Sequence, residues 1–334
     1  MKHTLAICLL IALLLTACAG KAGGPAPQVP TRANIATLEP LGTPMPKYGD
    51  VARALIRDFS NIGPRAAGTP GESQAAQYVA TVFQAIGYSP ETQTFTENSN
   101  GQSITSANII AVKKGTSPQE ILVGAHYDSS DKGAGADEAS GVAVMLELAR
   151  MLLNQTTPYT IRFVAFGATD AGLLGSYAYV NQLSQEEFES MVAMVDLDHL
   201  IAGDFAYAFG EEGIQAGVRD WSLEWASGNG LDLQTVREAK LGDPQTGKGV
   251  SDYSAFRDVG IPYVYFEASD WNLGDKNGKT QVDARFGERG VISGTKYDTL
   301  DYLDTNFPGR VDQHLNLFIT VAYNFLTQYE KPLQ

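Results

Sequence analysis

Cysteine is nearly absent from this chain of 334 residues. The only two cysteines, Cys8 and Cys18, both lie close to its start. A disulfide framework needs paired thiols in the folded part of a protein, and thiol catalysis needs at least one. The residues beyond Cys18 can therefore provide neither a disulfide nor a catalytic cysteine.

Basic residues are also few, with 24 Lys and Arg against 38 Asp and Glu. The net charge is -14 and the sequence pI is about 4.7. Nucleic acids and anionic lipid surfaces are bound by basic faces. We therefore expect no nucleic-acid partner and no direct binding to an anionic bilayer.

The apolar run from Leu5 to Leu15 is too short to span a bilayer, since a helix needs about 20 apolar residues to do so. Small residues surround the cysteine that follows, in Leu15-Thr16-Ala17-Cys18-Ala19-Gly20. This pattern is typical of a bacterial lipoprotein signal, with an ordinary secretory signal as the alternative. We expect residues 1–18 to form the signal, with Cys18 lipidated. The protein would then lie in the bacterial cell envelope, facing outside the cytoplasm, with membrane contact through the lipid anchor only.

Residues 19–47 hold six of the fifteen prolines and show no apolar periodicity. Such a segment is typical of a solvated tether between an anchor and a domain. Residues 48–334 are long enough for one large domain with a substantial core. We see no internal repeat and take a monomer as the default state.

Apolar strands alternate with amphipathic helices along this domain. The runs "ILVGA" (121–125) and "IRFVAF" (161–166) are almost continuously apolar, as expected for strands buried on both faces. This pattern predicts the α/β class: a single globular domain with a mostly parallel central sheet and helices on both faces. In such sheets ligands bind beyond the carboxyl ends of the strands.

Polar side chains follow several of these strands. His126 ends one strand, Asp137 opens the helical segment after it, Asp170 follows a second strand and Asp198 a third. Taken singly, Asp137 and Asp170 could cap helices and His126 could be an ordinary buried histidine. Together they predict that one imidazole and three carboxylates converge at one edge of the sheet.

A series of motifs in this order resembles the co-catalytic zinc aminopeptidases of peptidase family M28. They are "IGPRAAGTPGESQAAQYVATVFQAIGY", "GAHYDS", "GADEASGVAVMLELARML", "FVAFGATDAGLLGSYAYV", "VDLDH", "SDYSAFRDVGIPYVYFEASDW" and "KYDTLDYLD". The resemblance covers nearly all of the domain and implies the zinc aminopeptidase fold. It also implies that His126 and Asp198 bind a first metal, that Asp137 bridges to a second, and that Asp128 orients His126.

The sequence departs from the family pattern at specific positions. Where the family has a glutamate base followed by a glutamate ligand, this chain has Thr169 and Asp170. Asp170 is one methylene shorter but can still coordinate, whereas Thr169 cannot accept a proton from the attacking water at pH 7. Loss of the base costs on the order of 10² to 10⁴ in rate.

The last family ligand, a histidine, aligns with Gly294. A shifted register would offer Asp298 as that ligand instead, but it would spoil the match of the neighbouring residues. We expect Asp298 to cap the turn that follows it. His199 is next to Asp198 on a predicted strand and should point to the opposite face. His314 lies in a helical pattern, where an ordinary surface or core role is expected.

The remaining ligands suffice for one divalent ion, zinc, with Mn²⁺ or Mg²⁺ as alternatives. A second metal is not expected. Glu138, next to Asp137, is the candidate substitute for the missing base. The stretch "YVYFEASDW" (263–271) could line a substrate pocket or simply be an apolar strand.

Two other chemistries fit the sequence poorly. The segment "GDPQTGKG" (242–249) lacks the Ser or Thr of a phosphate-binding loop, and the serines lack a nucleophile elbow.

Two functions remain. The first is an aminopeptidase that removes amino-terminal residues from peptides with impaired activity, because the base and one ligand are replaced. The alternative is a lipoprotein that keeps the fold as an inactive pseudopeptidase and binds peptides or partner proteins.

Overall fold

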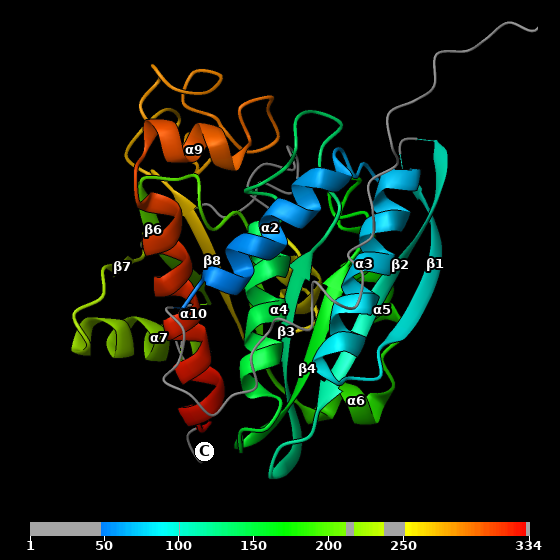
Figure 1. Cartoon of the computed structure of the whole chain (residues 1–334). Coiled ribbons are helices and arrows are strands. Elements are labelled where there is room, and N and C mark those ends of the chain that lie inside the picture. Colours follow the sequence, from blue (N-terminus) through cyan, green and yellow to red (C-terminus); the bar gives the residue numbers. More distant parts are fainter. Residues whose placement is uncertain (1–47, 100, 212–216, 237–250, 332–334) are drawn as a thin grey trace, which may run out of the picture.

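A mixed sheet of eight strands forms the centre of the molecule (Figure 1). The computed structural model describes residues 48–99, 101–211, 217–236 and 251–331. The signal, the lipidated Cys18, the tether and the segment 242–249 lie outside the described residues. The strands are β1 (Glu91–Ser99), β2 (Gln102–Lys113), β3 (Ser117–His126), β4 (Tyr159–Phe166), β5 (Met191–Leu197), β6 (Phe205–Gly210), β7 (Leu233–Gln234) and β8 (Tyr263–Ser269).

The strand order is β1-β2-β4-β3-β5-β8-β6-β7. The four central strands, β4, β3, β5 and β8, are mutually parallel, whereas β1, β2 and β6 pair antiparallel at the two sides. The expected α/β fold with a parallel centre is confirmed. The antiparallel additions were not expected, because β1 is mostly polar and exposed and has no apolar pattern.

Helices cover both faces of the sheet. They are α2 (Asp50–Ile62), α3 (Pro70–Ile86), α4 (Ser140–Leu152), α5 (Leu174–Asn181), α6 (Gln185–Ser190), α7 (Gly217–Gly228), α8 (Tyr253–Arg257), α9 (Leu300–Asn306) and α10 (Arg310–Gln328). On the near side in Figure 1, α2, α3, α4 and α10 pack together, with α4 against β3 and β5. On the opposite face α5 packs on β1 and β2, and α8 packs on β5 and β8.

Helix α4 is the most deeply buried helix element, since each of its residues is buried. This explains why "SGVAVMLELARML" is apolar on all sides. Its one buried carboxylate, Glu147, accepts hydrogen bonds from the backbone N–H groups of Gly49 and Ala52. Glu147 thus satisfies free donors at the start of α2. Helix α4 begins directly after Asp137 and Glu138, so the core fixes where these two acids lie.

Arg65 joins the loops at the carboxyl edge of the sheet. Its side chain is fully buried. Its guanidinium donates hydrogen bonds to five backbone carbonyls, those of Phe59, Gly63, Tyr127, Ala134 and Gly135. The loop after α2 and the loop before α4 are therefore fixed against each other.

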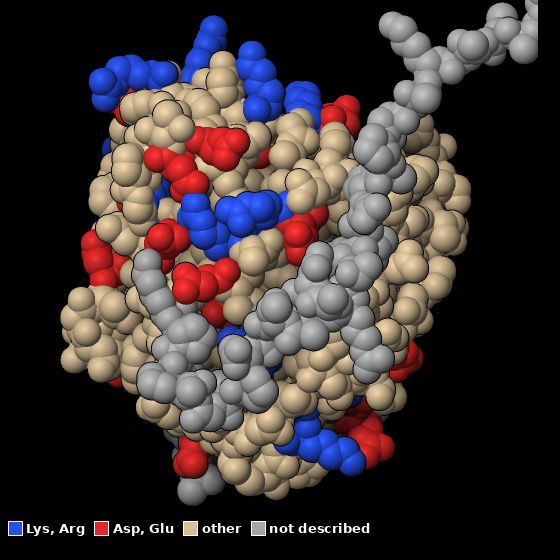
Figure 2. Space-filling view, in the orientation of Figure 1, with Lys and Arg blue, Asp and Glu red and all other residues tan. Residues whose placement is uncertain are grey.

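The surface charges are unevenly distributed. Figure 2 shows several Lys and Arg side chains along the upper edge of the molecule, and others beside Asp and Glu in its middle and at its lower end. Exposed basic residues of the loops include Lys132, Arg285, Arg289 and Lys296. No helix in the described part of the chain is long and apolar enough to cross a bilayer.

Candidate functional site

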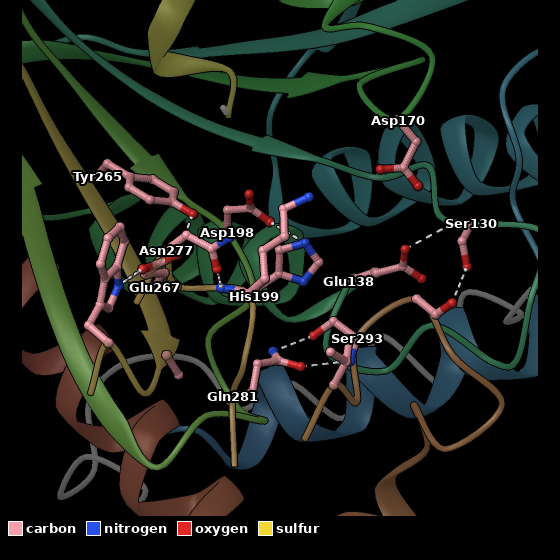
Figure 3. A pocket seen from close by; sticks show the side chains of 16 residues that line it. Ser130, Glu138, Asp170, Asp198, His199, Tyr265, Glu267, Asn277, Gln281 and Ser293 are labelled. Carbon is pink, nitrogen blue, oxygen red and sulfur yellow. Dashed lines mark hydrogen bonds and ion pairs between the residues drawn. The ribbon is translucent and has the colours of Figure 1, made fainter. Parts of the chain in front are cut away.

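A pocket of about 400 Å³ lies at the carboxyl ends of β3, β5 and β8 (Figure 3). Its walls come from the segments after these strands and from the loops before α4 and α9. The residues that line it are Ser130, Glu138, Asp170, Asp198, His199, Tyr265, Glu267, Ala268, Trp271, Asn277, Gly278, Lys279, Gln281, Val291, Ser293 and Gly294. Tyr265, Glu267 and Trp271 belong to the aromatic stretch 263–271, so that stretch does line the pocket.

His126 and Asp198 are in direct contact beneath the pocket. His126 is the last residue of β3, and its Nε2 lies 3.1 Å from Oδ1 of Asp198. On the other side of the ring, Nδ1 lies 3.1 Å from the carbonyl oxygen of Asp128 and 3.3 Å from Oδ1 of that residue. Asp128 therefore lies where a carboxylate can orient the ring of His126.

His199 does not point to the opposite face, so that prediction is wrong. Strand β5 ends at Leu197, and His199 has a left-handed backbone with φ of 51°. The alternation of a strand no longer applies there, and the side chain turns into the pocket. Its Nε2 lies 3.3 Å from Oδ1 of Asp198, and its Nδ1 lies 3.5 Å from Oδ2 of Asp137.

Three side chains thus offer ligand atoms to one point. His126, Asp198 and His199 each place one such atom within 4.8 Å of the others, the one group of this kind found in the described residues. Burial alone would raise the pKa of Asp198, but the neighbouring His199 and His126 hold it well below its usual range. Burial would lower the pKa of His199, yet Asp198 and Asp137 raise it to about 10. The charges of Asp198, His199 and His126 therefore act on one another at close range.

Asp137 lies beside this group with both carboxylate oxygens engaged. Oδ1 accepts hydrogen bonds from the backbone N–H groups of Ile201 and Ala202, at 2.7 and 2.9 Å. Oδ2 accepts from Nε2 of Gln281, at 3.0 Å, and from the hydroxyl of Ser293. Two oxygens offer about four acceptor positions, so these four donors fill them. A bridge between two metals would require these contacts to break.

Thr169 lies at the end of β4, held by a buried acid. Its hydroxyl donates to Asp252, whose two carboxylate oxygens are 3.1 and 2.9 Å away. Burial raises the pKa of Asp252 to about 7. Asp170 donates its backbone N–H to Oδ2 of Asp128, and its exposed side chain lines the pocket without joining the group at His126. Figure 3 shows Asp170 apart from Asp198 and His199.

Gly294, which we aligned with the last family ligand, has room for a Cβ in ordinary van der Waals contact with Glu138 and Ser130. It has a left-handed backbone with φ of 68°, and a Cβ at this position would find its nearest neighbour, Oε1 of Glu138, at 3.5 Å. Asp298 does not cap the turn after it, contrary to expectation, because Thr299 caps α9 through the N–H of Tyr302. Asp298 instead accepts from the backbone N–H groups of Asp137 and Gly294.

Glu138 has one carboxylate oxygen without a partner. Oε1 accepts from the N–H of Ser130 at 2.9 Å, whereas Oε2 is buried and has no hydrogen bond. Burial, followed by the nearby charges of Asp170 and Asp298, raises the pKa of Glu138 to about 8.

His314 lies in α10, away from the site. Burial lowers its pKa to about 4, so it is a neutral core residue, as expected.

Several residues of the site were not found from the sequence. Gln281 and Ser293 lie outside the motifs, and Asp252 and Glu267 lie within the motif 251–271 without having been assigned a role. For His199 the sequence does carry one indication, because this residue is next to the expected ligand Asp198. The strand was expected to continue through residue 199, however, which would point the side chain of His199 to the opposite face.

Comparison with known proteins shows the family and the fold of this chain. The alkaline phosphatase isozyme conversion protein of Escherichia coli is 31% identical over 310 residues, which are 84% of this chain and 90% of the relative. The probable lipoprotein aminopeptidase LpqL of Mycobacterium tuberculosis is 32% identical over 190 residues, 54% of this chain and 38% of the relative. The zinc aminopeptidase BSAP from Bacillus subtilis has the same fold, with a TM-score of 0.67 at 20% identity, covering 86% of this chain and 97% of that one.

The family model named Peptidase family M28 matches residues 108–319. This span contains the end of β3, the end of β5, the start of α4 and the loop that carries Gly294. The strand ends that form the pocket are therefore the part of the chain that the family shares, and the chain belongs to peptidase family M28.

Proposed function

We propose that this protein is a metal-dependent aminopeptidase of reduced hydrolytic rate that holds one divalent ion on His126, Asp198 and His199. The observation that carries the proposal is the convergence of these three ligand atoms within 4.8 Å at the pocket. Two imidazoles and one carboxylate, with a fourth position left to water or substrate, are a typical donor set for a catalytic zinc. Mn²⁺ or Mg²⁺ are less suited to two nitrogen ligands, so zinc is favoured.

The same residues do not fit two metals. Gly294 has no donor atom, and the carboxylate of Asp137 already accepts four hydrogen bonds. Asp170 remains as a lone carboxylate on that side, which is too few ligands for tight binding. A single ion, when bound, supplies Lewis-acid polarisation of a peptide carbonyl.

The reduced rate follows from Thr169. Its hydroxyl, which donates to Asp252, is neutral and too weakly basic to take a proton from water at pH 7. A missing general base costs on the order of 10² to 10⁴ in rate. Glu138 is the candidate replacement, because it lines the pocket and one of its carboxylate oxygens has no hydrogen-bond partner. With its pKa raised to about 8, Glu138 would accept a proton mainly at pH 8 and above.

The second candidate is a pseudopeptidase that binds peptides or partner proteins without cleaving them. The two replacements at Thr169 and Gly294 favour it, since the surrounding backbone and hydrogen bonds stay ordered without the reactive groups. In both cases we take a polypeptide as the ligand. The name of the Escherichia coli relative, which refers to conversion of alkaline phosphatase isozymes, supports a protein as the target.

We also propose that the protein is anchored in the cell envelope by a lipid on Cys18 and faces outside the cytoplasm as a monomer. The support is the pattern around Cys18 and the relative that is named a probable lipoprotein aminopeptidase. Labelling with a radioactive fatty acid, lost in Cys18→Ser, would test the anchor.

The experiment for the catalytic proposal is metal analysis of the purified protein together with hydrolysis of a panel of aminoacyl anilides, with and without added Zn²⁺ or Mn²⁺. We expect one ion per chain and slow hydrolysis that requires the metal and disappears in Asp198→Asn. Bound metal without turnover, or no metal at all, would contradict the enzyme and leave the pseudopeptidase.

A further inference from the structure

A fully buried carboxylate is hydrogen-bonded to Thr169. Asp252 directly precedes α8 and has no solvent exposure, whereas Thr169 follows β4 and is 8% exposed. The hydroxyl oxygen of Thr169 lies 2.9 Å from Oδ2 and 3.1 Å from Oδ1 of Asp252, to which it donates. Asp170, the next residue along the chain, lines the pocket (Figure 3). Thr169 therefore connects the wall of the pocket to a buried acid.

The loop that carries Thr169 is held on both sides of this residue. Ala168 has a left-handed backbone with φ of 56°, and its N–H donates to Oε1 of Glu72 at 2.9 Å. The N–H of Asp170 donates to Oδ2 of Asp128, also at 2.9 Å. Because the backbone is fixed before and after Thr169, its hydroxyl is held against the buried acid.

Asp252 can be ionised near neutral pH although it is buried. Burial raises its pKa to about 7, with His126 acting in the opposite direction and Asp128 adding to the rise. The other buried acid nearby, Asp196 on β5, has a pKa well above its usual range, because of burial followed by the charges of Asp252 and Asp198. Asp196 therefore holds a proton, and Asp252 is the member of this pair that can accept one at pH 7 to 8.

We propose that Thr169 and Asp252 act together as the general base of hydrolysis, with the hydroxyl of Thr169 relaying a proton from water in the pocket to Asp252. The inference rests on the proposed function, because it supplies a proton acceptor for that reaction. Alone, the neutral hydroxyl is too weakly basic to take this proton. In the relay it stays neutral, since it gives its own proton to Asp252 as it receives the proton of the water.

The step is balanced in protons and electrons. The O–H bond of the water breaks while its oxygen forms a bond to the carbonyl carbon of the peptide, and the proton passes through Thr169 to Asp252. When the C–N bond breaks, its electron pair goes to the nitrogen, and the same path returns the proton to this leaving amine. The carboxylate is then ionised again, and the products are the released amino acid and the shortened peptide.

Variants of the full chain test the relay in the hydrolysis of aminoacyl anilides with zinc present. We expect Asp252→Asn and Thr169→Val each to lower kcat by about 100-fold with little change in KM, because both groups act on the chemical step. Thr169→Ser keeps the hydroxyl and should retain most of the rate. Glu147→Gln, which changes a buried carboxylate in α4 outside the pocket, is the matched control and should hydrolyse the anilides as the unchanged protein does.

Calorimetric titration with Zn²⁺ adds a readout that does not depend on turnover. Neither Thr169 nor Asp252 belongs to the group of three possible ligands, so Thr169→Val and Asp252→Asn should bind zinc with the affinity of the unchanged protein. A loss of zinc affinity as large as the loss of rate would show that the two residues only support the metal site, and the relay would be wrong.

The rates separate this inference from the catalytic proposal. An unchanged rate in Asp252→Asn or in Thr169→Val would reject the relay and leave the enzyme, with Glu138 as its base. An equal loss in Thr169→Ser and Thr169→Val would also reject it, since the hydroxyl would then have no part. If Asp252→Asn fails to fold, these two variants of Thr169 still decide. Zinc bound by the unchanged protein without turnover would reject the proposed function, and the relay with it.

Discussion

The two sides of the pocket differ in the metal-binding and proton-accepting side chains that they carry. At the ends of β3 and β5, His126 and Asp198 are in contact, and His199 lies against Asp198, so three possible ligands meet there. After β4 and in the loop before α9 lie Thr169 and Gly294, which offer neither a base nor a ligand atom. Yet the second side is just as well ordered, since Thr169 is bonded to Asp252 and Gly294 to Asp298. The comparison teaches that the scaffold of an active site does not depend on its reactive side chains.

The largest effect on activity should come from introducing a base and a metal ligand at Thr169 and Gly294, on the side of the pocket that lacks them. We expect Thr169→Glu together with Gly294→His to raise kcat/KM for aminoacyl anilides on the order of 10² to 10⁴ with zinc present, because a base and a ligand return. A Cβ at position 294 would contact Glu138 and Ser130 without a clash, although the positive φ strains any residue other than glycine there. Because the new glutamate would lie near Asp252, adding Asp252→Asn should increase the gain by removing a like charge. A folded double variant that binds zinc and cleaves nothing would show that more than two side chains were lost.

Replacing His199 should weaken metal binding at the side of the pocket formed by the ends of β3 and β5. We expect His199→Ala to weaken binding of Zn²⁺ by about 100-fold or more, because only two ligands of the group remain. Calorimetric titration of the metal measures this directly. His314→Gln, which changes a buried histidine outside the site, should bind zinc as before. Equal metal affinity in His199→Ala would exclude His199 as a ligand.

A smaller effect is expected from Asp128→Asn. The substitution keeps the size of the side chain but removes the charge beside Nδ1 of His126. Loss of such a supporting carboxylate weakens metal binding by about 10- to 100-fold. The change should be visible in the same titration, while the melting temperature in the presence of chelator stays close to that of the unchanged protein. An unaltered metal affinity would mean that the carbonyl of Asp128 alone orients the ring.

The smallest effect is a dependence of stability on pH. In the folded state the pKa of Glu138 is raised to about 8 and that of Asp298 to about 7, mainly by burial. The folded chain therefore holds protons that the unfolded chain has released, so stability is full below the usual carboxyl pKa and falls as pH rises through 7 and 8. Melting curves with chelator should show this decline between roughly pH 5 and 9. Glu138→Gln should flatten it, and a curve that rises over this range would contradict the assignment.

The centre of the fold and the edge that carries the site could be predicted from the sequence. The apolar runs of β3 and β4 identify buried strands, and the residues after β3 and β5 meet because parallel strands end at the same edge. The exact partners could not be predicted. Whether Asp137 is free depends on Gln281 and Ser293, which are far away in the sequence and approach it only through the loops before α9.

Backbone conformation limited the prediction in the same way. The direction of His199 is decided by its own positive φ, two residues after the end of β5. A positive φ is uncommon for any residue other than glycine, so the sequence does not predict it here even though histidine adopts it more often than most residues. Strand β1 is hydrogen-bonded along the whole of β2 although its side chains are mostly exposed. Its place in the sheet follows from the backbone pairing, which leaves no pattern in hydrophobicity.

Arg65 gives the acidic site a cation of its own. Its guanidinium lies near Glu138, Asp298, Asp128 and Asp170, while each of its three nitrogens donates to backbone carbonyls. Since a guanidinium keeps its proton at any physiological pH, this charge is present from the moment the chain folds. The positive charge that holds the loops of the pocket together is therefore part of the chain itself.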